Sequence, residues 1–236
     1  MTRSRINMPL VRGKGVRLTL GRYNYGKAHP ALPLHDHHGA LEICFLVKGV
    51  QIYQMGACRY RLRGGDVFIA YPNERHSSGG FPQEKGVLYW MILEIPVRHE
   101  GFLGLPIRES RALLKALLEI KSRHFRGSWK MKERLDAITI LSGERRHSLN
   151  SLAIMVHAAA FLLEVVACAK SPSDRGPDRL LLPVLQTIEK SPGEPVSVPA
   201  LAARTGLSVP RFKARFKQEI GMPPGEYVLR VRIEEA

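Results

Sequence analysis

Residues 197–220 read SVPALAARTGLSVPRFKARFKQEI. Ser197 is a good N-cap for a short helix over residues 198–204, because its hydroxyl can accept a hydrogen bond from an amide of the first turn. Gly206 stands where a tight turn needs a residue that tolerates positive φ. Ser208 can cap the helix that follows. A helix, a short glycine turn and a second helix together predict a helix-turn-helix.

The second helix of this pair separates an apolar side from a basic side. Its apolar positions fall on one side at about 100° per residue, and they are Val209, Phe212, Phe216 and Ile220. From Arg204 to Gln218 there are five basic residues and no acidic one. A recognition helix needs an apolar back to hold it on its domain, and donors in front to reach phosphates and base edges. The alternative is the solvated basic face of an ordinary amphipathic helix. The candidate DNA-binding residues are Pro210, Arg211, Lys213, Ala214, Arg215 and Lys217.

The same region resembles the first helix-turn-helix of AraC-type (AraC/XylS family) transcription regulators. The matching positions are residues 197–208, Phe212, Phe216-Lys217, Gly221-Met222, Tyr227, Leu229-Arg230 and residues 232–236. The resemblance implies that residues 208–220 form the recognition helix. It also implies that a long helix joining two such motifs begins near residue 224.

Two departures from the family pattern affect this interpretation. Many members carry Arg where this chain has Ala214, so base contacts would depend on Arg211 and Lys213, with Arg215 and Lys217 closer to phosphates. The sequence also ends at position 236, within the expected joining helix. We therefore expect the first helix-turn-helix and only the start of the joining helix.

The first half of the chain has the pattern of a β domain. Short apolar or alternating runs separated by Gly and Pro signals cover residues 16–20, 41–47, 50–55, 58–62, 67–71 and 87–95. Such runs at near-even spacing predict an antiparallel sandwich or barrel. Residues 1–27 hold seven basic and no acidic residues, without an apolar segment behind them. They are interpreted as a basic arm and not as a signal peptide.

A cluster of candidate ligands lies within this half. His35, His37 and Glu42 precede a glycine with spacing that resembles the first cupin motif, and His76 follows in a loose second motif. In cupins that bind metal, the corresponding three His and one Glu converge inside the barrel. Imidazole and carboxylate ligands suit Fe, Mn, Ni or Zn.

The cluster departs from the cupin pattern, since His29 and Glu74 occupy positions where those motifs have glycine. AraC-type sensor domains also resemble cupins and mostly bind organic effectors without metal. We therefore expect an effector pocket at the four residues and no cofactor. A metal site formed by the same residues and purely structural histidines are the alternatives. His38 should point away from the pocket, because side chains alternate along a strand.

Helices are predicted from about residue 105 onward. Residues 107–125 carry the stripe of one helix, and a second helix covers 148–170. Its apolar positions are spaced as one seam, which is typical of a helix pair or a dimer interface, and they are Leu152, Val156, Ala159, Leu163 and Val166. Residues 171–177 contain two Pro and one Gly and predict a linker. A further helix is expected over 178–190.

Composition limits the function classes. Of 236 residues, 36 are Lys or Arg and 21 are Asp or Glu, which gives a net charge of +15. An anionic partner, nucleic acid first, is expected. Three cysteines are too few for a disulfide framework or a zinc finger, which favours a reducing cytosol. Polar residues interrupt the most apolar stretch, residues 149–168, so we expect no membrane span. The chain shows no phosphate loop, nucleophile elbow or paired catalytic carboxylates, and we expect no enzyme.

These observations predict an α+β protein of three parts and a linker. Residues 1–105 form a cupin-like antiparallel β-barrel that binds an effector, residues 106–170 a helical dimerisation segment, and residues 178–236 an AraC-type DNA-binding domain. The predicted function is a cytoplasmic transcription regulator with DNA, a small molecule and a second copy as partners, and RNA polymerase as a further candidate. The alternatives are a metal-dependent cupin oxygenase or isomerase with a vestigial tail, and a truncated inhibitory partner of a full-length regulator.

Overall fold

A computed structural model describes residues 5–13, 16–96, 102–144, 148–170, 180–190, 194, 196–220 and 223–235. The chain divides into two compact units, Met1–Ser171 and Pro172–Ala236, which are described separately. The linker predicted at residues 171–177 falls within residues 171–179, which lie outside the described residues.

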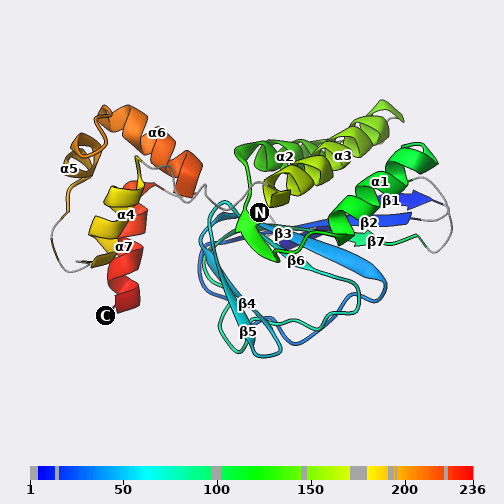
Figure 1. Ribbon diagram of the computed structural model, residues 1–236, viewed down its shortest axis with the longest axis horizontal. Helices are drawn as coiled ribbons and strands as arrows, with labels where there is room; N and C mark the ends of the chain where they lie inside the picture. The colour runs from blue at the N-terminus through cyan, green and yellow to red at the C-terminus, as the bar shows by residue number, and fades with distance from the viewer. Residues whose placement is uncertain are drawn as a thin grey trace. The chain divides into compact units, whose positions relative to one another are not determined.

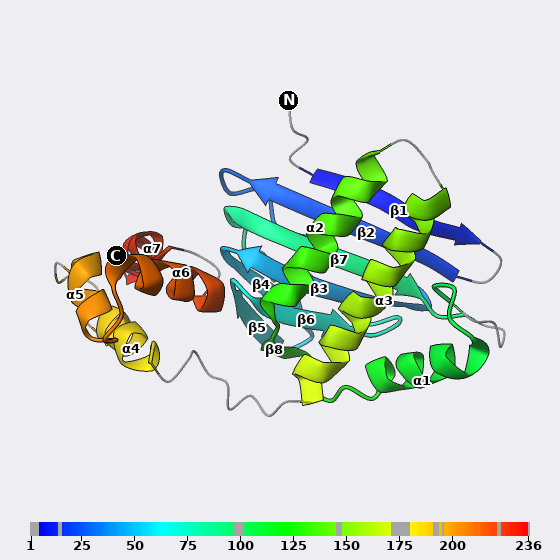
Figure 2. The same cartoon turned by 90° about the horizontal axis from the view of Figure 1, so that it is seen from above.

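The first unit is built on a six-stranded antiparallel sheet (Figures 1 and 2). Its strands, in spatial order, are β1 (Arg5–Gly13), β2 (Val16–Tyr25), β7 (Gly86–Glu94), β3 (Ala40–Lys48), β6 (Asp66–Ala70) and β8 (His124–Arg126). The hairpin of β4 (Val50–Met55) and β5 (Cys58–Arg63) forms a second sheet. The predicted α+β class with an antiparallel β domain is therefore confirmed.

Strand β3 is buried along nearly its whole length because both of its faces are covered. Leu41, Ile43 and Phe45 belong to the core under the helices. Cys44 and Leu46 belong to a second core on the opposite face, which they share with the β4–β5 hairpin. A strand buried on both faces has a continuous apolar run instead of an alternating one.

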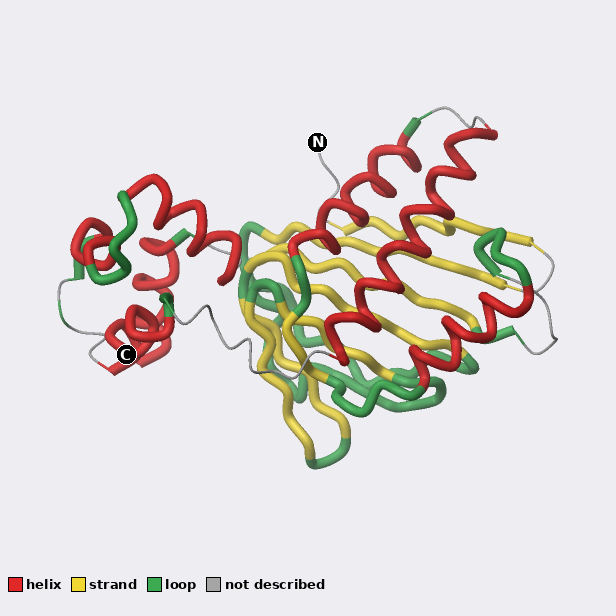
Figure 3. Tube along the Cα trace, turned by 45° about the horizontal axis from the view of Figure 1, so that its top comes forward, coloured by secondary structure: helices red, strands yellow, loops and turns green. Residues whose placement is uncertain are grey.

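Three helices cover one face of the large sheet (Figure 3). They are α1 (Ile107–Leu118), α2 (Trp129–Gly143) and α3 (Ser148–Lys170). Helix α3 is long and apolar enough to cross a membrane by length and composition alone. Its buried side chains, Phe161 and Leu162 among them, pack in the core between helices and sheet, and this packing accounts for part of its apolar character.

The β domain is closed less completely than the predicted barrel. Among the described residues, the segments between β2 and β3 and between β6 and β7 contribute only isolated bridges, such as His35 with His76 and His29 with Gln83. These segments contain four prolines, which lack the amide donor that a continuous ladder needs. The opposite wall is therefore a hairpin with bridged loops.

Two further predictions of elements were wrong, and one helix was not predicted. Residues 5–13 are not a free arm but strand β1, where half-buried Ile6, Met8 and Leu10 alternate with exposed residues. The helix predicted over 107–125 ends at Leu118, because the later residues pair with β6 as β8. Helix α2 was not predicted, although its buried residues recur at helical spacing.

The second unit is helical. Its helices are α4 (Leu182–Lys190), α5 (Val198–Ala203), α6 (Val209–Ile220) and α7 (Pro224–Glu235). The Ser197 hydroxyl accepts a hydrogen bond from the Ala200 amide at 3.2 Å and so caps α5. Gly206 has φ +68° in the connection to α6. One small apolar core joins the four helices, and Phe212 and Phe216 are fully buried within it.

Candidate functional site

The structure brings together the four residues of the predicted effector site. The ligand atoms of His35, His37, Glu42 and His76 all lie within 4.8 Å of one another. They come from three places in the sequence: the loop before β3, β3 itself and the loop after β6. Exposed His38 is not in the cluster.

Glu42 and His76 form the buried side of this four-residue site. Glu42 is 6% exposed and lies on the face of β3 that carries Cys44 and Leu46, away from the helices. His76 is fully buried. His35 and His37 are only partly covered. A ligand therefore meets the imidazoles of His35 and His37 first.

The charge of Glu42 is retained despite its burial. Burial alone would raise its pKa, but contact with His37 and His76 outweighs this effect and lowers the pKa to about 2. Burial lowers the pKa of His76, but the close contact with the negatively charged Glu42 carboxylate acts more strongly, so that the pKa is raised. Burial lowers the pKa of His35. The site thus combines one charged carboxylate with three imidazoles, and the pKa values of His35 and His76 are shifted in opposite directions.

The buried polar atoms of the site are close together without being paired well. Glu42 Oε2 lies 2.8 Å from His76 Nε2 and 3.5 Å from His37 Nε2. None of these three atoms has a hydrogen-bond partner of acceptable alignment. Buried polar atoms are rarely left in this state unless a water, ion or ligand joins them.

The other ring nitrogen of two histidines is already occupied. His35 Nδ1 lies 2.9 Å from the Pro33 carbonyl, and His76 Nδ1 lies 3.1 Å from the Glu74 carbonyl. A carbonyl accepts from Nδ1–H, so each neutral ring has the lone pair of Nε2 free for a ligand. This tautomer and donor set fit a divalent transition-metal ion.

Two aromatic side chains that the sequence analysis did not single out lie next to the site. The rings of Tyr53 and Phe68 stack at 4.4 Å, and Tyr53 lies 6.2 Å from the His76 ring. The Tyr53 hydroxyl contacts Cys44 Sγ at 3.1 Å. Alternation along the strands was the available signal, since Phe68 and Cys44 lie opposite each other in paired strands.

The predicted DNA-binding residues all lie on α6, and each of them is exposed. They are Pro210, Arg211, Lys213, Ala214, Arg215 and Lys217. Their neighbours Phe212, Phe216 and Ile220 are buried. Arg204, counted with the basic residues in the sequence, instead donates to the Thr187 hydroxyl at 2.6 Å.

The apolar seam predicted on α3 follows one side of the helix but is not evenly exposed. The side chains of Leu152, Val156 and Leu163 are 53–58% exposed. Leu149, one turn before Leu152, is 63% exposed. Val166, expected in the same seam, is 8% exposed and packs in the core under the helices. We use "α3 outer face" below for Leu149, Leu152, Val156 and Leu163.

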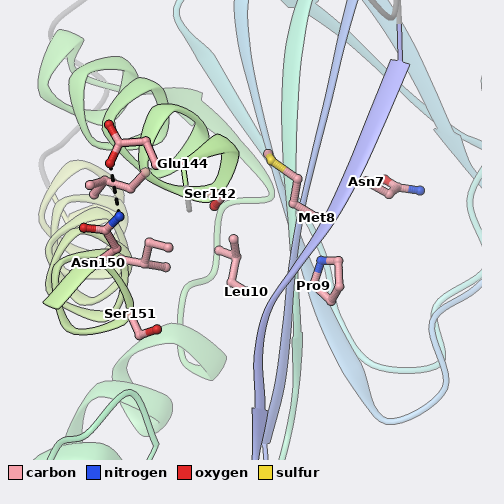
Figure 4. A pocket seen from close by; sticks show the side chains of 10 residues that line it. Asn7, Met8, Pro9, Leu10, Ser142, Glu144, Asn150 and Ser151 are labelled. Carbon is pink, nitrogen blue, oxygen red and sulfur yellow. Dashed lines mark hydrogen bonds between the residues drawn. The ribbon is translucent and has the colours of Figure 1, made fainter. Parts of the chain in front are cut away.

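A separate pocket of about 600 Å³ lies between β1 and the facing ends of α2 and α3 (Figure 4). Met8 and Leu10 line it on the β1 side. On the helical side, the Asn150 amide donates to the Glu144 carboxylate at 3.1 Å. None of the residues predicted to bind effector or DNA lines this pocket.

The first unit is thus a cupin-like antiparallel β domain that carries a cluster of three histidines and a glutamate, and a helical unit follows it. Residues 29–162 match the family described as the AraC-like ligand binding domain, and the chain belongs to this family. It is an AraC-type transcription regulator, as the resemblance in its sequence predicted.

The chain is similar to a known activator over most of its length. It is 24% identical over 218 residues to the HTH-type transcriptional activator RhaR of Pectobacterium carotovorum subsp. carotovorum (strain PC1), and this match covers 88% of this chain and 72% of the activator. Among solved structures it is similar to the AraC-like transcriptional activator CuxR, at 10% identity and a TM-score of 0.37 over 94% of this chain and 76% of that one. It is also similar to KdgF from Halomonas sp., at 14% identity and a TM-score of 0.30 over 40% of this chain and 83% of that one.

Proposed function

We propose that this regulator binds DNA sequence-specifically through α6, and that a small molecule at the four-residue site controls the binding. The observation that carries the proposal is the presence in one chain of a polar ligand site and a basic helix with a buried apolar back. An effector that prefers one state of the protein shifts the population toward that state. Binding of chromosomal DNA would place the protein in the cytoplasm.

The chemistry of the α6 surface supports the proposed DNA contact. Phe212 and Phe216 hold the helix on its unit, so the basic side chains are presented on a fixed support. Arg211 and Lys213 offer donors for base edges, while Lys217 is suited to a phosphate. Ala214 can contribute only an apolar contact.

Dimerisation through the α3 outer face is part of the same proposal. Four large apolar side chains on one side of a helix are costly to leave in water. A second copy that presents the same face would bury them in a symmetric helix pair. Contact with RNA polymerase remains a prediction.

A metal ion is a second candidate for the occupant of the four-residue site. The unpaired buried atoms of His37, Glu42 and His76 favour it, since they lie together and lack aligned partners. The ion would be held by the three imidazoles and Glu42, and would supply Lewis-acid binding of an effector's oxygen donors. The effector would then reach it past His35 and His37.

DNA binding is tested by titration against the DNA beside the protein's own gene and against scrambled DNA. Affinity for the natural sequence should fall steeply as salt rises, because phosphate contacts release counterions. Arg211→Ala should cost about 1–3 kcal/mol on the natural sequence and reduce the preference for it. Lys217→Ala should weaken binding to both DNAs alike. Equal affinity of the unaltered protein for both DNAs at all salt concentrations would contradict specific binding.

A further inference from the structure

The turn of residues 71–76, which follows β6, holds three of the four site residues in place. His76 belongs to it and exchanges two backbone hydrogen bonds with His35, at 2.8 and 3.0 Å. The Asn73 amide donates to the His37 carbonyl at 3.1 Å, and Asn73 has the left-handed φ of +63°. The conformation of this turn therefore sets where the imidazoles lie.

Glu74 fixes the turn through its backbone and its side chain. Its carbonyl accepts the hydrogen bond of His76 Nδ1, which directs Nε2 toward Glu42. Its carboxylate accepts the Tyr71 amide at 2.8 Å and pairs with both terminal nitrogens of Arg123. The guanidinium in turn lies 4.7 Å from the centre of the Tyr71 ring. Such bidentate pairs impose direction as well as attraction.

Arg123 belongs to the segment that leads from α1 to α2. Its carbonyl accepts the Ile69 amide at 2.9 Å, and the next three residues form β8. Ser128, the N-cap residue of α2, donates its hydroxyl to Glu164 of α3 at 2.6 Å. The start of α2 is thus a few residues from a side chain that holds the turn of the site.

We propose that the Glu74–Arg123 ion pair is a positioning device that orients His76 in the four-residue site and ties this site to the helical layer. Ligand binding would then tighten the turn and, through Arg123, the segment that leads into α2. The second half of this statement rests on the proposed function, because it requires that the site bind a ligand. The orientation of His76 can be tested without any ligand.

The test compares Arg123→Met with Arg126→Met in the full chain. Arg126 is a matched control because it follows in β8, has the same 26% side-chain exposure and pairs with Asp66 instead of the turn. Hydrogen exchange of the metal-free protein is measured on peptides that contain Asn73 and His76. We expect about tenfold faster exchange there in Arg123→Met than in Arg126→Met, since local opening is what exchange detects. Arg123→Lys, which keeps the charge, should restore part of the protection.

The same proteins are then titrated with Co²⁺, whose absorption spectrum reports its coordination. Loss of a residue that orients a ligand should weaken binding about 10–100-fold, whereas Arg126→Met should bind like the unaltered protein. Co²⁺ should also slow exchange in residues 119–128 of the unaltered protein, and this effect should be absent in Arg123→Met.

The outcomes separate the two proposals. If the unaltered protein binds no Co²⁺ but Arg123→Met still loosens the turn selectively, the positioning role stands and the metal candidate fails. If the two Met variants show the same exchange in the turn, the positioning role is overturned, whatever Co²⁺ does. If Co²⁺ binds and protects residues 119–128 equally in Arg123→Met, the link to the helical layer is overturned.

Discussion

Single buried side chains determine what the β domain can bind. Glu42 interrupts an otherwise apolar strand, and its contacts with two histidines keep it charged with a pKa of about 2. Cys44, two positions further, shares the same face but has no such support, and burial raises the pKa of its thiol. Cys44 thus packs as an apolar residue, while Glu42 keeps a charged oxygen in the interior.

Glu42→Gln tests this role at the residue scale. The amide keeps the shape of the side chain but removes the negative charge and turns one ligand oxygen into a donor. We expect Co²⁺ affinity to fall at least about tenfold, because even residues outside the ligand set cost that much. Glu109→Gln, a change on the exposed surface of α1, serves as the control. Unchanged Co²⁺ affinity in Glu42→Gln would remove this residue from the ligand set.

Helix α3 carries large apolar residues both on its buried side and on its exposed side. Phe161, Leu162 and Val165 face the core under the helices and are fully buried. The α3 outer face carries residues of similar hydrophobicity, but their side chains are 53–63% exposed. Substitutions on the two faces should therefore have different consequences, since only the buried face supports the fold of the unit.

Val156→Lys should separate association from folding. Val156 is 58% exposed, so the change should alter the thermal stability of the isolated subunit little. It should raise the dimer dissociation constant at least about tenfold, because a charge would enter an apolar contact. Sedimentation across a concentration series measures this constant. Leu34→Lys, at a similarly exposed loop position, should leave it unchanged, and equal effects of both variants would argue against the α3 outer face as the interface.

At the scale of the whole molecule, each of the two units is stabilised by apolar cores of its own. Among the described residues, the core of the second unit begins at Leu181, and the last buried residue in the cores of the first unit is Val166. Domains with their own cores can unfold independently. Helix α6, which we propose contacts DNA, and the four-residue site therefore draw their stability from different sets of side chains.

Phe212→Ala should affect one unit and leave the other intact. Removal of a fully buried ring costs about 3–5 kcal/mol, which a small helical unit can scarcely withstand. Calorimetry should show a lowered or lost transition for the second unit, with the transition of the first unit in place. Phe45→Ala, in the core under the helices, should produce the reverse pattern. A single transition that both variants shift equally would contradict independent cores.

Some strands and helices could be predicted from the sequence, and others could not. Strands β3 to β7 and helix α3 were predicted closely, because period and turn residues are local signals, whereas the prediction covered only the first half of β2. Strand β1 was not predicted, because the seven basic residues among positions 1–27 obscure the short alternation of Ile6, Met8 and Leu10. Strand β8 could not be predicted, since its pairing with β6 joins residues far apart in the sequence.

The sequence by itself determined the class of the protein, because the caps, turns and apolar spacing of the last sixty residues and the His/Glu spacing of the first half are local patterns. It also identified which four side chains could form a site. Only the tertiary structure decided that Glu42 and His76 are buried while His35 and His37 are partly exposed, and that Arg123 pairs with Glu74 beside them. Burial and long-range pairing depend on how strands and loops pack together, and no local pattern in a sequence records this packing.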